Sequence, residues 1–438
     1  MDDDLGRLAA QCYVYGFPLV FDLDQVLRYA TTGVGAVPGA PYNAFGHARQ
    51  LAGPDDTFVT INNDTLYSMA QVDVSAGPVR LDVPDTGGRY YVLQLVDAWT
   101  DNFAYVGKRA TGTGPGAFLL VAPGWDGTAP EGATVIRFPT DVASIVGRWA
   151  VDGPDDLPAV HALQDATTLT PPVDRPVSGV PPVPASGDEA LDFWERCRVW
   201  SRRFPPAARD RDRQAQFAPL GVTGDVPVHD ADDAVLQALR DGYARGRAAV
   251  EDSLRSGSSP VVNGWHLTFH AFDYNADFFE VGTRDDPSFV IADPEQRVVE
   301  RAAAALGGLW GNHAYEAAYV MTYVDDHGEP LTGGRTYTLT LAPPPPVDGF
   351  WSLTMYDVPD YFLVANEIDR YSIGDRTPGL SLGPDGGVAI TMSHARAGDA
   401  ANWLPAPAGA FRPVLRMYVP RAAVLDGTYR LPPIVRVR

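Results

Sequence analysis

The chain has 438 residues, with 55 acidic and 34 basic side chains and a formal charge of −21 at pH 7. Such a surface repels nucleic acid and anionic membranes, and no apolar run reaches the roughly 18 residues of a membrane span. We therefore expect a small-molecule ligand as the partner, with no nucleic acid and no membrane involved. The composition leaves the oligomeric state open, a homo-oligomer included.

The first residues, MDDDLGRLAA, lack the basic, apolar and cleavage regions of a secretory signal. This favours a cytoplasmic location over a secreted form with a trimmed leader. The chain has two cysteines, Cys12 and Cys197, which are too few for a disulfide framework. We expect both to be buried thiols.

Residues 4–30 repeat apolar side chains at helical spacing and predict an opening helix that is broken or bent near Gly16 and Pro18. From Thr57 onward, short β-favouring runs alternate with Gly, Pro and Asp, a pattern typical of an antiparallel sandwich or barrel. Residues 141–149 (DVASIVGRW) then resemble a short helix.

A proline-rich stretch at 171–189 favours a linker, and the segments that follow it at 189–204, 231–255 and 294–307 have helical periodicity. After His313 the strand pattern returns. The sequence thus predicts an α+β fold in which two antiparallel β-rich lobes, sandwich- or jelly-roll-like, are bridged by a helical middle segment. The predicted domain divisions are 1–150, 151–310 and 311–438.

The motifs of several common chemistries are missing from the sequence. It contains no Gly-x-Ser-x-Gly elbow, no His-Glu-x-x-His, no Walker A, no Gly-x-Gly-x-x-Gly before a helix and no Cys-x-x-Cys. No cofactor is therefore predicted.

Two N-terminal stretches concentrate polar side chains at strand ends. TINNDTLYS brings Asn62, Asn63 and Asp64 to the start of a strand, where the alternative to a binding site is a turn that caps its own backbone. QLVDAWTDNFAYVGKR places Asp97 and Asn102 after a buried strand.

A third stretch, residues 350–377, is the densest in aromatic and charged side chains. Flat stacking surfaces beside charged groups are typical of sites for polar organic ligands. The side chains concerned are Trp351, Tyr356, Asp357, Asn366, Tyr371, Asp375 and Arg376, followed later by His394. For Asp375 and Arg376 the alternative is a structural ion pair that holds the loop.

Several stretches together, among them YGFPLV, TINNDTLYS, GPDDLPAVHALQ, FWSLTMYD, RYSIGDRT and NWLPAPAG, resemble two families of unknown function that occur in tandem. They are family 1254, which residues 1–150 resemble, and family 1214, which residues 311–438 resemble. The resemblance implies β-rich domains bridged by helices, and it implies no settled activity. Besides the candidates above, Arg370, Asn402 and Trp403 match its signatures.

The segment at 264–280 contains His266 and His270, four residues apart. On a helix they would share a face and, with Asp273 or Asp277, could form a partial site for a divalent metal. The alternative is that both histidines are packed and hydrogen-bonded.

These residue types favour a cofactor-independent enzyme for a small polar organic molecule, nominally a hydrolase, with lyase and isomerase chemistry also open. Asp64 or Asp375 would be the base, Arg376 an anion clamp and Asn63 an oxyanion donor. The other candidates are assigned to substrate binding: Asn62, Asp97, Asn102, Trp351, Tyr356, Asp357, Asn366, Tyr371 and His394. The alternatives are a protein that binds carbohydrate or another small molecule without catalysis, and a structural protein whose polar signatures lock the lobes together.

Overall fold

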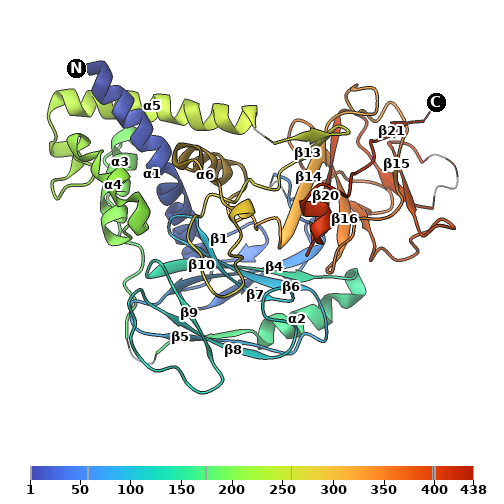
Figure 1. Ribbon diagram of the computed structural model, residues 1–438, viewed down its shortest axis with the longest axis horizontal. Helices are drawn as coiled ribbons and strands as arrows, with labels where there is room; N and C mark the ends of the chain where they lie inside the picture. Colours follow the sequence, from blue (N-terminus) through green and yellow to red (C-terminus); the bar gives the residue numbers. More distant parts are fainter. Residues whose placement is uncertain are drawn as a thin grey trace.

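The computed structural model describes residues 2–56, 59–172, 175–257, 259–396, 398 and 401–437. Two β-rich lobes stand beside a group of helices, with the N-terminal lobe below the helices in Figure 1 and the C-terminal lobe to their right. The predicted α+β class with antiparallel, β-rich lobes is therefore confirmed. In the described part of the chain, no helix combines the length and the apolar character that crossing a membrane requires.

The N-terminal lobe is a sandwich of two sheets. A five-stranded sheet with the order β3-β4-β10-β6-β7 packs on a four-stranded sheet with the order β11-β5-β8-β9, and apolar side chains of both sheets fill the space between them. The strands are β3 (Phe45–His47), β4 (Thr65–Asp73), β5 (Val79–Val83), β6 (Tyr91–Asp97), β7 (Asn102–Gly107), β8 (Gly116–Val121), β9 (Thr134–Arg137), β10 (Val142–Ala150) and β11 (Thr168–Thr170). Helix α2 (Leu157–Ala166) packs against the same core, and a small hairpin of β1 (Gly33–Val34) and β2 (Val37–Pro38) precedes the lobe.

The short helix predicted at residues 141–149 is wrong, because β10 occupies this segment. Strand β10 is central in its sheet and pairs antiparallel with both β4 and β6. All of its residues are buried, so the alternation of polar and apolar residues that marks a half-exposed strand is absent. A fully buried strand and a short helix cannot be distinguished by periodicity alone.

The structure describes six further α-helices. The first five form the helical part of the molecule, and the last is a short helix near the C-terminus. They are α1 (Asp2–Thr31), α3 (Glu189–Arg203), α4 (Arg211–Ala215), α5 (Asp233–Ser256), α6 (Pro294–Gly308) and α7 (Ala422–Leu425). The helices predicted at 189–204, 231–255 and 294–307 are thus confirmed. The first helix is not broken, since α1 continues past Gly16 and Pro18, and a bend at these residues stays a prediction.

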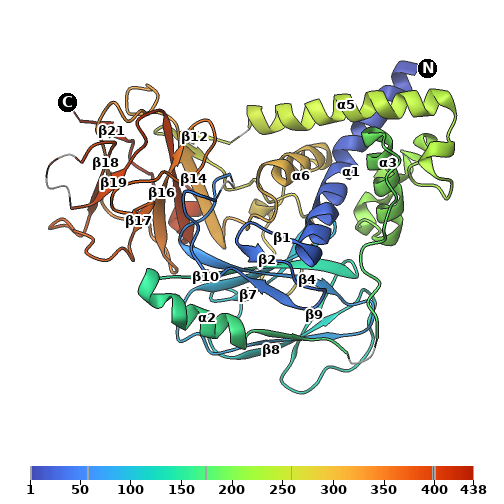
Figure 2. The same ribbon diagram turned by 180° about the vertical axis from the view of Figure 1, so that it is seen from behind.

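Helix α1 packs along α5, as Figures 1 and 2 show from opposite sides. Two glycines on one face of α5 permit this close approach. A Cβ atom at Gly242 would lie 2.3 Å from Cβ of Ala9, and one at Gly246 would lie 2.4 Å from Cβ of Tyr13. Cys12 of α1 lies against Cys197 of α3, and both are buried free thiols, as predicted.

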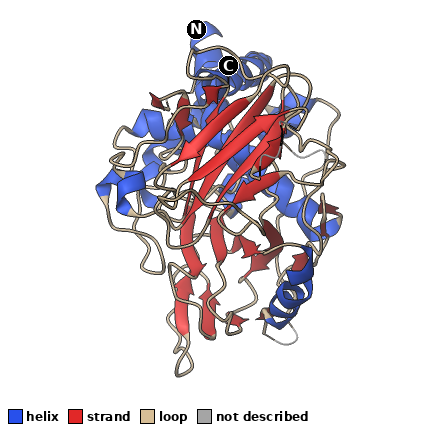
Figure 3. Cartoon of the chain, turned by 90° about the vertical axis from the view of Figure 1, so that its right-hand side faces the viewer, coloured by secondary structure: helices blue, strands red, loops and turns tan. Residues whose placement is uncertain are grey.

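The C-terminal lobe is a second sandwich, and its strands occupy the centre of Figure 3. A six-stranded sheet with the order β12-β13-β14-β20-β16-β17 packs on a four-stranded sheet with the order β19-β18-β15-β21. The strands are β12 (Val261–Val262), β13 (Trp265–Leu267), β14 (Ala317–Thr322), β15 (Tyr337–Leu341), β16 (Trp351–Asp357), β17 (Ser372–Gly374), β18 (Val388–Ser393), β19 (Trp403–Pro405), β20 (Phe411–Tyr418) and β21 (Val435–Arg436).

Segments between residues 151 and 310 also contribute to both lobes. Strand β11 pairs with β5 of the N-terminal lobe, and β13 pairs with β14 of the C-terminal lobe. The domain boundaries at 150 and 310 stay predictions.

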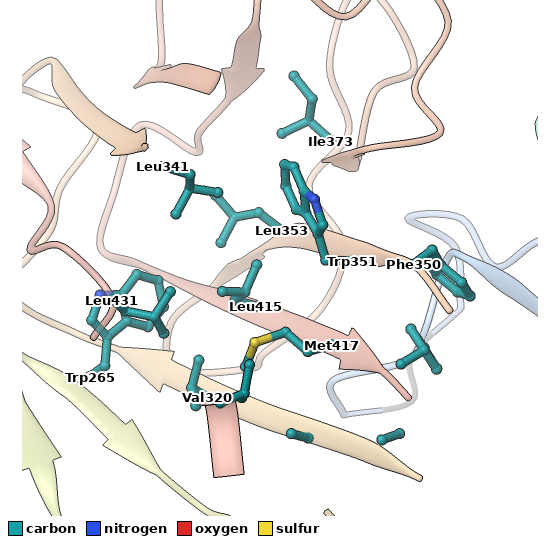
Figure 4. Close-up of a cluster of buried hydrophobic side chains, with 14 of the residues drawn as sticks. Trp265, Val320, Leu341, Phe350, Trp351, Leu353, Ile373, Leu415, Met417 and Leu431 are labelled. Atoms are coloured by element: carbon teal, nitrogen blue, oxygen red, sulfur yellow. The ribbon is translucent and has the colours of Figure 1, made fainter. Parts of the chain in front are cut away.

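The two faces of the six-stranded sheet differ in chemistry because side chains alternate along each strand. One face is apolar and packs in the core of the lobe, where Figure 4 shows Leu353, Leu415 and Met417 among the clustered side chains. The other face, which we call the polar face, carries Ser352, Thr354 and Tyr356 of β16 and Arg412, Arg416 and Tyr418 of β20. All of these side chains except Thr354, which contacts Arg416, contact the N-terminal lobe, so the lobe junction is polar.

Candidate functional site

The loop at 60–64, which leads into β4, lies against the polar face of the C-terminal lobe. The side-chain amide of Asn62 donates to the hydroxyl of Tyr418 at 2.6 Å, and its Oδ1 accepts the backbone N–H of Asp64 at 2.5 Å. Asn62 therefore caps a turn, as the alternative interpretation expected, and also reaches a distant strand. Its role in binding stays a prediction. Asn63 instead donates to the carbonyl oxygen of Ala52 at 2.6 Å.

Asp64 is buried at this junction and is held by two hydroxyl groups of the other lobe. Ser352 donates to Oδ2, and Ser372 donates to Oδ1 at 3.2 Å. Both serines belong to the C-terminal lobe, on the neighbouring strands β16 and β17. The N- and C-terminal signature residues therefore meet in space.

Arg376 also crosses the junction. It pairs with Asp152 at 2.8 Å and donates to the carbonyl oxygens of Val151 at 3.1 Å and Asp64 at 3.3 Å. Its guanidinium lies 3.6 Å from the centre of the Phe350 ring, a cation–π contact. The expected alternative, an ion pair between Asp375 and Arg376, is not formed, because Arg376 points back to the N-terminal lobe.

Asp375 follows β17 and faces the other way, into an open pocket of about 450 Å³. One carboxylate oxygen accepts the backbone N–H of Trp351 at 3.2 Å. Desolvation raises the pKa of Asp375 to about 6, against the opposing effects of this N–H and of the Arg376 charge. The pocket is lined by Pro344, Trp351, Asp375, Thr377, Gly379, Leu380, Leu382, Gly386 and Val388.

Two of the predicted binding residues lie in the N-terminal lobe, away from this pocket. Asp97 ends β6 and accepts the backbone N–H groups of Trp99 and Asp101, both at 2.9 Å. Burial and the neighbouring Asp101 carboxylate raise the pKa of Asp97 to about 8. Asn102 donates to the carbonyl oxygen of Gly311 at 2.9 Å and so ties β7 to the segment before β14.

The other predicted binding residues make contacts close to their own positions in the C-terminal lobe. Asp357 accepts the N–H of Phe362, Asn366 accepts that of Arg370, and Tyr371 donates to Asp369. His394 is exposed, and its Nδ1 contacts the carbonyl oxygen of Ala406 at 3.1 Å. These contacts hold turns and loops.

Tyr356 belongs to the junction instead. Its hydroxyl donates to the carbonyl oxygen of Ile61 at 2.6 Å and accepts from Arg416 at 2.7 Å.

The helical face expected for His266 and His270 does not exist. His266 lies in β13 and pairs in register with Met321, while His270 lies in the turn that follows and contacts Asp273 at 2.7 Å. Among the residues that the structure describes, no three His, Cys, Asp or Glu side chains come close enough together to hold a metal ion.

Sequence reasoning missed the arginines and tyrosines that fill the rest of the junction. Arg148 of β10 and Arg416 of β20 are both buried, and Tyr67, Tyr319 and Tyr418 surround them. A single arginine in a strand usually marks a solvent-exposed face. The available signal was that each of these arginines interrupts a run of apolar residues in a strand that would otherwise be buried on both faces.

The chain is similar to solved structures and to two family models. The crystal structure of the VPA0106 protein from Vibrio parahaemolyticus is 25% identical, with a TM-score of 0.77 over 99% of this chain and 100% of the other. An uncharacterized protein from Burkholderia cenocepacia is 13% identical, with a TM-score of 0.45 over 100% of this chain and 94% of the other. No curated protein matches the chain.

Two segments of the chain match family models. Residues 42–171 match the family described as protein of unknown function DUF1254, and residues 316–422 match the family described as protein of unknown function DUF1214. The predicted resemblance to these two families in tandem is therefore confirmed.

Proposed function

We propose that this protein is a cofactor-independent enzyme for a small polar organic molecule, with Asp375 as its acid–base group and hydrolysis as the nominal reaction. The observation that carries the proposal is the Asp375 carboxyl at the wall of an open pocket of about 450 Å³, with its pKa raised to about 6. Carboxyl groups with perturbed pKa values in clefts are typical of acid–base catalysts.

A carboxyl group with this pKa is mostly ionised at pH 7 and can accept a proton. In hydrolysis, Asp375 would take a proton from water as the water oxygen attacks the substrate, and would then return it to the leaving group. Trp351 and Leu380 supply apolar surface for the body of the substrate, and Thr377 supplies a hydroxyl. Arg376 does not join this chemistry, because it is paired with Asp152.

The same pocket favours a second function, which is binding without catalysis. Of the described residues that line it, Asp375 alone is titratable. Glycoside hydrolysis, for comparison, generally uses two carboxyl groups on opposite sides of the bond. A pocket with one carboxylate beside an indole and two leucines suits a ligand that pairs an apolar surface with a hydroxyl or an amine.

The decisive experiment compares the parent protein with Asp375→Asn on chromogenic esters and glycosides between pH 4.5 and pH 8. We expect kcat/KM of the parent to rise with pH through about 6, because the ionised carboxylate is the base. Asp375→Asn should lose at least about 100-fold, in line with the usual contribution of a positioned acid–base group. Asp360→Asn makes the same chemical change at an exposed aspartate outside the pocket and should behave as the parent.

Ligand binding separates the two functions. One outcome is that no substrate turns over, while sugars or polyols raise the thermal unfolding midpoint of the parent and not that of Asp375→Asn. This outcome would favour binding without catalysis over the enzyme function. Turnover that is unchanged in Asp375→Asn would contradict the proposed role of this carboxyl.

A further inference from the structure

Two guanidinium groups are buried at the lobe junction without a carboxylate partner. Arg148 is 7% exposed and Arg416 is 3% exposed. Among the described residues, no Asp or Glu oxygen lies within ion-pair distance of either group, and Asp64 acts on Arg416 only at longer range. Burying an unpaired charge is costly, so an arginine in this position requires another source of negative charge or of hydrogen-bond acceptors.

Arg148 is held by neutral acceptors. Its guanidinium donates to Gln94 Oε1 at 2.8 Å, to the carbonyl oxygen of Trp310 at 2.9 Å and to Asn312 Oδ1 at 3.5 Å. The side chain of Tyr67 is a further hydrogen-bond partner. The three acceptors carry no charge, so they do not compensate the charge of the guanidinium.

Arg416 is held in the same way. Its N–H groups reach the hydroxyl of Tyr356 at 2.7 Å and, at 2.9 Å each, Thr354 Oγ1 and the carbonyl oxygen of Thr60. These three acceptors are neutral. Both arginines thus keep their full positive charge.

Tyrosine side chains connect the two arginines. Tyr418 lies near both guanidinium groups, and Tyr67 and Tyr319 lie near Arg148. The Arg148 guanidinium lies 5.4 Å from the centre of the Tyr67 ring. Tyr67 and Tyr319 are only partly buried, so the cluster is reached from solvent on their side.

We propose that Arg148 and Arg416, with the hydroxyl groups of Tyr67 and Tyr319, bind the oxyanion group of a small organic molecule, a carboxylate or a phosphate ester. Arginine offers paired donors that match both groups. The overall charge of the protein is −21, so two arginines without an ion-pair partner among the described residues form a local positive site that attracts an anion. This site is independent of Asp375, and the proposed function can fail while the anion site stands.

The test titrates full-length protein with sodium succinate and with phenyl phosphate at constant ionic strength, with sodium chloride as the reference salt. Binding is measured by calorimetry and by the thermal unfolding midpoint. We expect saturable binding of at least one organic anion, a loss of at least tenfold in affinity in Arg148→Met and a smaller loss in Tyr67→Phe. Arg202→Met removes an exposed arginine that pairs with Asp225 and serves as the matched control, with affinity unchanged.

The two anions also identify the source of the oxyanion, since tighter succinate binding indicates a carboxylate ligand and tighter phenyl phosphate binding a phosphate ester. If Arg148→Met does not fold, Tyr67→Phe decides, because it removes one partly exposed hydroxyl and no charge. The proposal is overturned if neither anion binds more tightly than chloride, or if the folded variants bind as tightly as the parent.

Discussion

Asn62 and Tyr418 are 356 residues apart in sequence, yet the amide of Asn62 donates a hydrogen bond to the Tyr418 hydroxyl at 2.6 Å. Asn62 belongs to the loop that enters the N-terminal sandwich, and Tyr418 ends the central strand β20 of the C-terminal sheet. Both residues are buried. The contact therefore joins the two lobes in a region from which water is excluded.

Removing one partner should weaken the junction. We expect Asn62→Ala to lower the free energy of unfolding by about 1–3 kcal/mol, because the Tyr418 hydroxyl is left buried without its donor. Tyr418→Phe should have an effect of similar size, and the double variant should cost less than the sum of the two. Urea unfolding curves of the four proteins measure this coupling. If the two losses of unfolding free energy were strictly additive, the hydrogen bond between Asn62 and Tyr418 would not contribute to the stability of the junction.

The contact between α1 and α5 depends on small residues. Gly246→Ala should lower the free energy of unfolding by about 1–3 kcal/mol, because the new methyl group would overlap Tyr13. Gly6→Ala is the control, since the nearest atom to its added Cβ lies at an ordinary 3.8 Å. That substitution should be neutral or stabilising because alanine favours a helix. Equal thermal midpoints for the two variants would argue against close helix packing at Gly246.

Asp97 should make stability depend on pH. Burial and the Asp101 carboxylate raise its pKa to about 8, above the ordinary aspartate value near 4. The folded protein holds this proton more tightly than the unfolded chain does, so the stabilisation is full below about pH 4 and is lost as the pH rises through about 8. Asp97→Asn keeps the acceptor oxygen and cannot ionise. Its free energy of unfolding, measured by urea at pH 5 and pH 8, should fall less with pH than that of the parent. Parallel pH profiles would contradict the raised pKa.

The two cysteines should be inert in the folded protein. Burial raises the pKa of Cys12, which lies against Cys197, so the reactive thiolate is disfavoured and shielded. We expect no reaction with a chromogenic disulfide reagent at pH 8, and the release of two equivalents in urea. Ser178→Cys places a thiol at an exposed site and should release one equivalent without denaturant. Rapid labelling of the native parent would show that α1 and α3 separate.

Local sequence patterns predicted much of the secondary structure. Helices α3, α5 and α6 were found because apolar residues recur at helical spacing on one face while charged residues face solvent. Strand β10 was missed because it is buried on both faces, and its apolar run carries no period. The helix assumed for His266 and His270 failed for a related reason, since spacing alone does not distinguish a strand followed by a turn from a helix.

By itself the sequence determined the fold class, the tandem families and the polar motifs, because each depends on residues close together in the chain. It also offered a self-capping turn as the alternative interpretation of Asn62 and Asp64, and in the structure the side chain of Asn62 accepts the N–H of Asp64. Only the tertiary structure decided what those residues contact and which charges remain unpaired. Ser352 lies 288 residues from Asp64 in the sequence, and Arg148 and Arg416 are buried although they belong to strands of different lobes. The physical reason is that hydrogen-bond partners and desolvation depend on distance in space, which a pattern of neighbouring residues does not contain.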